Sequence, residues 1–505
     1  MSSIRVTYSG LISMLIGLVS AVTGLIFTLI VTRSLSPEEY GAWGLIGSLI
    51  MYVLVLDPIV TYWTTRETAR CEDSGKTALV TNGLFSLVGV AGYFIISFFI
   101  ANETVVSFDI LVLGAMLVPV TFINRVLTAL NLGWKPQATS YGIIAFELSK
   151  IPSALVLVYN LQLGLEGAIV ATLISYVVSI IVLGINARSK LKTKIKKIYV
   201  KKWIKLFWIP VYRKSQSVIF SLDILVFVII SDSVIGVAFF TASLAVSILV
   251  GHAGQIAQAI YPKLLSGGKS EHLNENLVRF FYFGFPLAAI SIVFARPALF
   301  ALNPEYEIAT VVVTIMTIRT FLYVLSNIFQ DAIHGAETID ASENPKFLDF
   351  VKSKLFVLPT IILIQYSLYV FILAIVLIFT KDNSTQLELV VNWAIVSLGV
   401  QIPFTIYFWK MAKNQFSLSI DTVTSIKYLF STIFVFTFTY IIVEKFLVYH
   451  ESIFDFLPHL VLYVGLGVLM YTLLTLLIDT KTRTLAKSIL MEFTKNPKSS
   501  DKNDV

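Results

Sequence analysis

Long apolar runs alternate with short polar connections along most of this chain. Each run holds about 20 residues or more, which is the length that a helix needs to cross a hydrocarbon core of about 30 Å. Six runs precede residue 187 and eight follow residue 214. The pattern predicts an all-helical membrane protein with about fourteen spans, near residues 8–32, 41–64, 78–101, 108–132, 140–160, 165–186, 215–232, 236–261, 278–301, 308–331, 355–380, 389–409, 425–444 and 457–478.

A basic segment separates the two sets of runs. From Ala187 to Lys214 it reads ARSKLKTKIKKIYVKKWIKLFWIPVYRK and contains eleven Lys and Arg residues. Clusters this basic beside a span are retained in the cytoplasm, so we interpret the segment as a connector that fixes topology. Its alternation of apolar residues with Lys also suits an interfacial helix on anionic lipid. We expect no nucleic-acid partner, because spans tether the segment on both sides and it carries no recognition motif.

The remaining basic residues support the same orientation. Of the 38 Lys and Arg residues in the chain, 31 lie in connections that we assign to the cytoplasm and seven lie elsewhere. The connections at 102–107, 161–164 and 233–235 contain none. We therefore expect a multi-pass protein of the cell membrane with both termini in the cytoplasm. The polar tail at 479–505 is expected to form a short amphipathic helix and then disorder.

Composition agrees with this class. Hydrophobic residues make up 56% of the 505 residues and charged residues only 14%, which is outside the range of soluble domains. The single cysteine, Cys71, excludes an internal disulfide and a cysteine-based metal cluster. The first apolar run is too long for the core of a cleavable signal and is expected to remain as a span.

Six spans before the basic segment give a second six-span unit the same starting orientation as the first. Such halves are parallel repeats that work as two lobes around a central cavity. The fourth and tenth spans end in related sequences, AlaLeuAsnLeuGly and AlaIleHisGly, although two loops can also agree by chance. The predicted units are an N-terminal lobe (1–187), a linker (188–214), a C-terminal lobe (215–412), two additional spans (413–478) and a tail (479–505).

The candidate chemistry lies inside the spans. The sequence has no catalytic constellation, no nucleotide-binding glycine loop and no metal-spaced histidine cluster, and its outer connections are too short for the active site of a membrane glycosyltransferase. We therefore expect that the chain is not an enzyme. Ionisable residues within spans are costly in hydrocarbon and usually face the protein interior or a watery cavity. They are Asp57, Arg125, Glu147, Lys150, Asp223, His252 and Arg319, with Arg33 at the outer end of the first span.

These residues allow more than one interpretation. Glu147 and Lys150 are spaced i, i+3 and would share a helix face, where they could neutralise one another. Lys150 and Arg319 lie near the middle of their spans, and together with Arg125 they could form a central cationic cavity; Arg125 is also close enough to the cytoplasmic end to reach the headgroups. Asp223 is protonated, paired across helices, or a site for a coupling cation.

Two stretches of this sequence resemble a known family. IVTRSLSPEEYGAW (residues 30–43) looks like the entry signature of the polysaccharide transporter, or Wzx-like flippase, branch of the MATE-like superfamily of multidrug, oligosaccharidyl-lipid and polysaccharide exporters. LDILVFVIISDSVIGVAFFTA (222–242), continuing to IYPKL (260–264), is similar to the opening of that family's second lobe. The sequence departs from the family pattern at 57–59, where a glycine is more common after the acid.

The resemblance implies a V-shaped pair of six-helix lobes that moves a lipid-linked oligosaccharide outward by alternating access. Its substrate is then a glycan on polyprenyl phosphate or pyrophosphate, and glycan-assembly enzymes are expected partners. Cationic side chains bind such anionic headgroups by charge-assisted hydrogen bonds, which is the role expected of Arg33, Arg125, Lys150 and Arg319. Coupling or gating, with H⁺ or Na⁺ as the only expected accessory ligand, is the role expected of Asp223, Glu147 and Asp57.

Three alternatives to a flippase stay open at this stage. A cation-coupled multidrug exporter on the same fold would favour acids and aromatic residues in its cavity, and three central cations disfavour it. A membrane glycosyltransferase or polymerase would need a large outer loop. A scaffold for such enzymes would move no lipid in liposomes.

Overall fold

The computed structural model describes residues 23–103, 106–135, 137–259, 271–335, 337, 351–416, 418, 421–480 and 482–483. Within these ranges the chain folds into helices and contains no β-strand. The first half contains α2 (Pro37–Val53), α3 (Pro58–Ala69), α4 (Gly75–Glu103), α5 (Phe108–Gly114), α6 (Leu117–Trp134), α7 (Gln137–Ala154), η1 (Leu155–Asn160) and α8 (Gly164–Leu191). The second half contains α10 (Trp208–Ser231), α11 (Ile235–Ser247), η2 (Ile248–Ala259), α13 (Glu271–Val293), α14 (Ala295–Leu302), η3 (Pro304–Ala309), α15 (Thr310–Gly335), α17 (Lys354–Thr380), α18 (Gln386–Gln415), α19 (Thr422–Phe446) and α20 (Ile453–Ile478).

The predicted all-helical membrane class is confirmed. In the described part of the chain, twelve helices are long and apolar enough to cross a membrane, and a bent pair brings the number to thirteen. These twelve coincide with the third to fourteenth predicted spans. The first predicted span lies largely outside the described residues, where only the apolar helix Thr23–Ser34 is seen, and the predicted tail is almost wholly outside them. The count of fourteen therefore stays a prediction.

The second predicted span is not one continuous helix. It is split into α2 and α3, which meet at an angle of 65°. Pro58 is the first residue of α3. In one continuous helix a proline at this position would lack a backbone donor and would clash with the carbonyl four residues earlier, whereas at the start of a helix it is tolerated. Backbone bonds of the i to i−3 type carry the chain through the break, including Asp57 N to Leu54 O at 3.3 Å. The break brings the Asp57 side chain to a helix junction inside the protein, where it is only 3% exposed.

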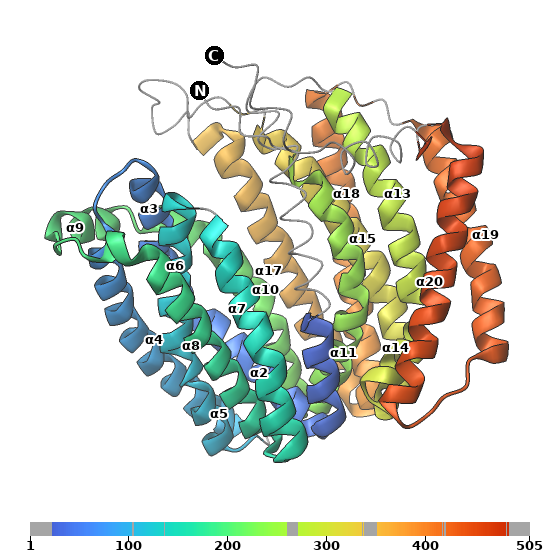
Figure 1. Cartoon of the computed structure of the whole chain (residues 1–505), viewed down its shortest axis with the longest axis horizontal. Helices are drawn as coiled ribbons and strands as arrows, with labels where there is room; N and C mark the ends of the chain where they lie inside the picture. Colours follow the sequence, from blue (N-terminus) through green and yellow to red (C-terminus); the bar gives the residue numbers. More distant parts are fainter. Residues whose placement is uncertain are drawn as a thin grey trace, which may run out of the picture.

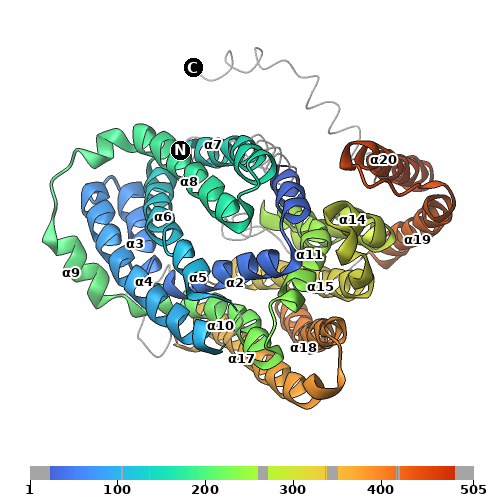
Figure 2. The same ribbon diagram turned by 90° about the horizontal axis from the view of Figure 1, so that it is seen from below.

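The helices form two groups, which Figure 1 shows side by side: the helices up to α8 in one and α10 to α20 in the other. They come together at one end of the molecule, where Thr32 Oγ1 donates to the Leu302 carbonyl and Asn303 Nδ2 donates to the Thr32 carbonyl. Figure 2 shows α2 lying between the rest of its own group and α10 and α11. The two-lobed arrangement thus agrees with the predicted class, while the exact domain boundaries stay predictions.

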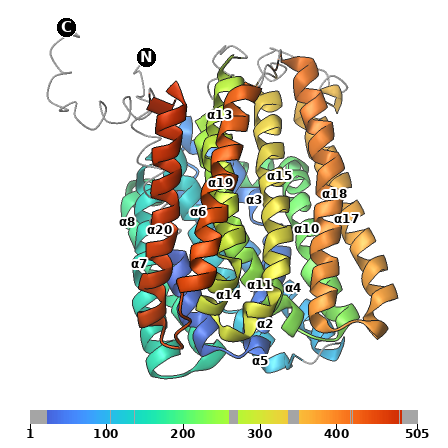
Figure 3. The same cartoon turned by 90° about the vertical axis from the view of Figure 1, so that its right-hand side faces the viewer.

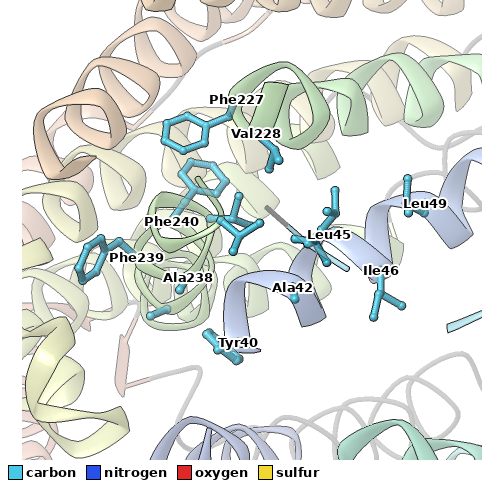
Figure 4. Packing of buried hydrophobic residues seen from close by; sticks show 14 of the residues in the cluster. Tyr40, Ala42, Leu45, Ile46, Leu49, Phe227, Val228, Ala238, Phe239 and Phe240 are labelled. Carbon is cyan, nitrogen blue, oxygen red and sulfur yellow. The ribbon is translucent and has the colours of Figure 1, made fainter. Parts of the chain in front are cut away.

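An apolar seam joins the two groups. Figure 4 shows Leu45 on the side of α2 toward Phe240 of α11 and Phe227 of α10, and all three belong to one buried cluster. Two α2 glycines permit this approach. A Cβ on Gly41 would overlap the Val234 carbonyl, and one on Gly44 would lie 3.0 Å from a Val237 methyl group.

The two additional helices pack mainly on the second group. α19 and α20 lie at the right-hand edge of the molecule in Figure 1 and stand in front of α13 and α14 in Figure 3, and together they contact both of these helices. Their buried residues Phe436 and Leu460 belong to one cluster with Ile290 and Phe294. They therefore extend the second group, and their connection also contacts the first group, because Arg33 donates to the Glu451 carbonyl.

The basic linker contains one short helix, α9 (Lys197–Lys205), which docks on the first group. Trp203 is fully buried beside Val60, Ala78 and Val126. Its indole Nε1 donates to both oxygens of Glu67 at 3.2 Å, and Lys202 Nζ pairs with the same carboxylate at 3.0 Å. The predicted interfacial helix is thus anchored to protein through its aromatic residue.

The opposite side of the linker remains available for the predicted membrane contact. Ile198 and Ile204 of α9 and Ile195 just before it are all exposed, and they alternate with lysines. The binding of anionic lipid by this surface stays a proposal.

Trp203→Ala is expected to release α9 from the first group. Truncating a buried tryptophan typically costs about 3–5 kcal/mol, and the change also leaves buried Glu67 with one partner fewer. If opening of the linker precedes cleavage, trypsin should cut the lysine-rich linker at least about 100-fold faster. Ile198→Ala, at a side chain that is 72% exposed, is the control and should leave the rate unchanged. Equal cleavage of wild type and Trp203→Ala would mean that Trp203 does not hold the linker.

Candidate substrate and coupling sites

The first buried polar cluster forms at the break between α2 and α3. Asp57 accepts hydrogen bonds from Asn82 Nδ2 and Thr61 Oγ1, both at 3.2 Å. Its Oδ2 lies 3.7 Å from a terminal guanidinium nitrogen of Arg125, whose side chain is 38% exposed. Lys214 of α10 is also close enough to interact electrostatically with Asp57 and Arg125. Two cations from different helix groups therefore flank one carboxylate.

The second cluster lies on α7. Thr23 Oγ1 donates to Glu147 Oε2 at 3.1 Å. The Lys150 ammonium lies 3.9 Å from the centre of the Phe27 ring and 5.3 Å from that of Phe146, and Glu147 attracts it electrostatically. Cation–π contacts of this kind stabilise a partly desolvated cation. The geometry agrees with the interpretation that Glu147 offsets the charge of Lys150.

The third cluster surrounds Asp223, which is 3% exposed. Its Oδ1 accepts from its neighbour Ile224 N at 2.8 Å, and its Oδ2 accepts from the Tyr369 hydroxyl at 2.8 Å. Trp393 Nε1 in turn donates to the Tyr369 oxygen at 2.6 Å. Hydrogen bonds from α10 and α17 thus fix the carboxylate in one orientation, and Trp393 of α18 holds the Tyr369 hydroxyl in place.

Arg319 borders this cluster from α15. It is 7% exposed, and it attracts Asp223 electrostatically without forming a direct ion pair with it in the described structure. Its guanidinium lies over the rings of Phe220 and Tyr323, 5.2 and 5.0 Å from their centres. The Nε–H has no hydrogen-bond partner among the described residues. A buried charge with an unused donor is costly unless something else binds it.

A cavity of about 430 Å³ lies beside Arg319, between α11, η2 and α15. We call it the arginine cavity; its polar lining comprises Arg319, His252, Thr320, Tyr323, Asn327 and Asp331. A smaller cavity, of about 160 Å³, lies next to it in the second group. A ligand placed in the arginine cavity could reach the guanidinium that the protein leaves incompletely hydrogen-bonded.

Arg33 lies apart from these clusters. Its three guanidinium nitrogens donate to the carbonyls of Ala301, Phe300 and Glu451, each at 2.9 Å. The first two carbonyls belong to the last turn of α14, where a cation is favourable. Arg33 therefore ties the helix Thr23–Ser34 to the second group, and its predicted headgroup role stays a prediction beside this structural one.

The structure thus places each of the three predicted acids near one predicted cation. Asp57 lies with Arg125, Glu147 with Lys150, and Asp223 with Arg319. It does not bring Lys150 and Arg319 into contact, and Lys150 lines neither of the two cavities in the second group. Their predicted convergence on one volume therefore stays a prediction.

Sequence reasoning missed the neutral members of these sites. Asn82, Tyr369, Asn327, Gln365 and Gln401 all lie within membrane-length helices and contribute hydrogen bonds or cavity walls. Carboxamides are also costly in hydrocarbon, so a search of the spans for Asn and Gln would have found four of the five. No cluster of metal-ligating residues occurs in the described part of the chain.

Solved structures show which known proteins have this fold. The lipid II flippase MurJ in an inward closed conformation matches with a TM-score of 0.66 and 12% sequence identity, covering 94% of this chain and 99% of its own. A multidrug resistance MATE-family transporter of the MOP superfamily, in an inward-facing conformation, matches with a TM-score of 0.56 and 14% identity over 78% of this chain and 95% of its own. A MOP-superfamily transporter from Pyrococcus furiosus matches with a TM-score of 0.52 and 14% identity over 80% and 94%.

No protein-family model and no curated protein sequence matches the chain. At identities this low the structural similarity establishes architecture, and the polysaccharide branch stays a prediction. This chain has the fold of the MurJ flippase and of MATE-family transporters.

Proposed function

We propose that this protein moves an anionic, lipid-linked glycan across the membrane by alternating access between its two helix groups. The observation that carries the proposal is Arg319, a buried guanidinium with an unused donor on the wall of a 430 Å³ cavity. Asp223, the acid that attracts Arg319 electrostatically, already accepts from Ile224 and Tyr369. A phosphate or pyrophosphate would supply both the charge and the acceptors that Arg319 lacks.

The additional helices give further support to a flippase. The MurJ match leaves 6% of this chain uncovered, about 30 residues, whereas α19 and α20 hold 25 and 26 residues. At least part of this pair therefore has a counterpart in MurJ. The MATE match leaves 22% uncovered, which is enough to omit both helices.

The other predicted residues enter the proposal with defined partners. Arg125 and Lys150 would contact the headgroup as it passes between the two helix groups. Arg33 would contact the headgroup at the outer end of the path. Asp223, Glu147 and Asp57 would couple transport to H⁺ or Na⁺, because each is a carboxylate beside a cation whose pairing a bound ion would change. Glycan-assembly enzymes and anionic lipid at α9 are the proposed partners.

Export of an apolar cation is the second candidate, favoured by the MATE similarity and by aromatic rings around Arg319.

Proteoliposomes can distinguish the two candidates. A short-chain prenyl-phosphate hexose is placed in both leaflets, and a membrane-impermeant sugar oxidase is added outside. The protein should expose the inner-leaflet fraction to oxidation and should not move ethidium. Movement of ethidium alone would support the multidrug exporter, and movement of neither would contradict transport of both classes.

The native cysteine offers a test of the proposed orientation. Cys71 is exposed in the connection between α3 and α4, which the basic residues assign to the cytoplasm. A membrane-impermeant maleimide should therefore label it in inside-out vesicles and not in intact cells. In a Cys71→Ser background, Asn383→Cys in the connection before α18 should label in intact cells. The reverse pattern would invert the proposed topology.

A further inference from the structure

A second cavity, of about 160 Å³, lies inside the second helix group between α10, α15, α17 and α18. Five carboxamide side chains line it, and we call it the amide cavity: Gln216, Asn327, Gln330, Gln365 and Gln401. Ser217, Ser326 and two tyrosines complete its polar wall, and Ile362 is its single apolar lining residue. No charged side chain lines it among the described residues. A site needs only about 10–15 Å³ of such volume to hold one water, so this cavity has room for a ring-sized polar group.

The amides have hydrogen-bonding capacity that the protein does not use. Each carboxamide offers two donor hydrogens and an acceptor oxygen. Gln365 Nε2 donates to Gln401 Oε1 at 3.0 Å, and Gln401 Nε2 donates to Thr405 at 3.0 Å. Gln216 donates once, to the Pro359 carbonyl at 2.7 Å. Asn327 makes no side-chain hydrogen bond within the described structure. Several donors and acceptors therefore remain for a ligand.

The two cavities adjoin each other. Tyr323 and Asn327 line both, and Tyr323 is also the residue over which the Arg319 guanidinium lies. A ligand with its anionic group at Arg319 could thus place a neighbouring neutral group among the amides. The buried floor of the amide cavity is formed by Gln365 and Gln401, which are 5% and 2% exposed.

The lining chemistry distinguishes between ligand classes. An uncharged cavity wall does not offset the charge of a phosphate or a metal cation. Amides and hydroxyls instead match ligand groups that both donate and accept hydrogen bonds. Tyr323 and Tyr366 add ring surface with a polar end. A sugar ring presents hydroxyl groups around an apolar face, and it fits both features.

We propose that the amide cavity binds the sugar next to the phosphate of the transported lipid. Arg319 then binds the charged phosphate, and the carboxamides form hydrogen bonds with the hydroxyl groups of the sugar. This inference rests on the proposed function and adds to it a preference for substrates that carry a neutral sugar. It assigns specificity to the second helix group alone.

Equilibrium binding to the purified protein in nanodiscs tests this assignment. The probes are farnesyl phosphate esters of glucose, galactose and N-acetylglucosamine, and the reference is farnesyl methyl phosphate, which has the same charge and no sugar. We expect the wild type to bind at least one sugar ester about tenfold more tightly than the methyl ester, as one or two net hydrogen bonds would provide. Asn327→Leu and the double variant Gln365→Leu/Gln401→Leu should reduce this ratio toward one.

The controls separate the possible failures. Asn414→Leu, at an exposed position of α18, should leave the ratio unchanged. Asn327→Leu removes no hydrogen bond within the described structure, so it should fold even if the double variant does not. Equal affinity of the wild type for sugar and methyl esters, or an unchanged ratio in Asn327→Leu, would overturn the sugar site while leaving the flippase proposal intact. Failure of the wild type to bind any of the phosphate lipids would overturn both.

Discussion

Arg319→Gln is expected to reduce transport of a prenyl-phosphate glycan by about 10- to 100-fold, because a hydrogen bond to a charged group contributes about 1.5–3 kcal/mol. Glutamine keeps a polar side chain of moderate length and removes the positive charge. Arg319→Lys should retain part of the activity, since the charge survives and the planar geometry does not. Initial rates of sugar exposure in proteoliposomes measure the effect.

A second arginine provides the matched control for this experiment. Arg296 lies on α14 with a side chain that is 55% exposed and pairs with Glu307. Arg296→Gln removes the same charge far from the arginine cavity and should leave transport unchanged. If Arg319→Gln, folded and reconstituted at the wild-type level, transports as well as the control, phosphate recognition by Arg319 is wrong.

Asp223→Asn is expected to abolish the stimulation of transport by a cation gradient while the protein stays folded. The amide keeps the shape of the carboxylate, and its oxygen can still accept from Ile224 N. Its NH2 group then faces the Tyr369 oxygen and donates to it, in place of the carboxylate oxygen that accepts from the hydroxyl. The amide cannot take up a proton or neutralise Na⁺. The measurement compares transport with and without an imposed pH or Na⁺ gradient. Tyr369→Phe removes two hydrogen bonds, the one to Asp223 and the one from Trp393, but it leaves the acid and should retain part of the stimulation. Full stimulation in Asp223→Asn would leave Asp223 a structural acceptor.

The helices could be predicted from sequence because the bilayer sets their length and composition. The break at Pro58 could not be predicted from these signals, since α2 and α3 together are as apolar as a single span. A proline at the start of a helix and a proline that interrupts one look alike in sequence. Whether the helix breaks at Pro58 depends on tertiary contacts. Asn82 and Arg125, which lie on other helices, contact the Asp57 carboxylate at the break.

The individual candidate residues could be predicted from the sequence, but which acid lies next to which cation could not. Asp57 and Arg125, or Asp223 and Arg319, are distant in sequence and meet only through tertiary packing. Glu147 and Lys150 are the exception, because helical spacing alone brings them together. Arg33 was identified by its charge, whereas its use of three backbone carbonyls depends on where α14 ends.

In the linker, too, some features follow from the local sequence and others depend on tertiary packing. Its charge predicts orientation, and its alternation predicts an amphipathic helix. The burial of Trp203 requires an acceptor on another helix, and Glu67 supplies it. Nothing within the linker itself identifies that acceptor.

The central claim is that a buried arginine in the second helix group recognises the phosphate of a lipid-linked glycan. A cryo-EM structure of the protein with a farnesyl phosphate hexose bound tests it most directly. The account predicts phosphate density in the arginine cavity within hydrogen-bonding distance of the Arg319 guanidinium, with its Nε–H now used. Phosphate density elsewhere, with the Arg319 Nε–H still unpartnered, would contradict the claim.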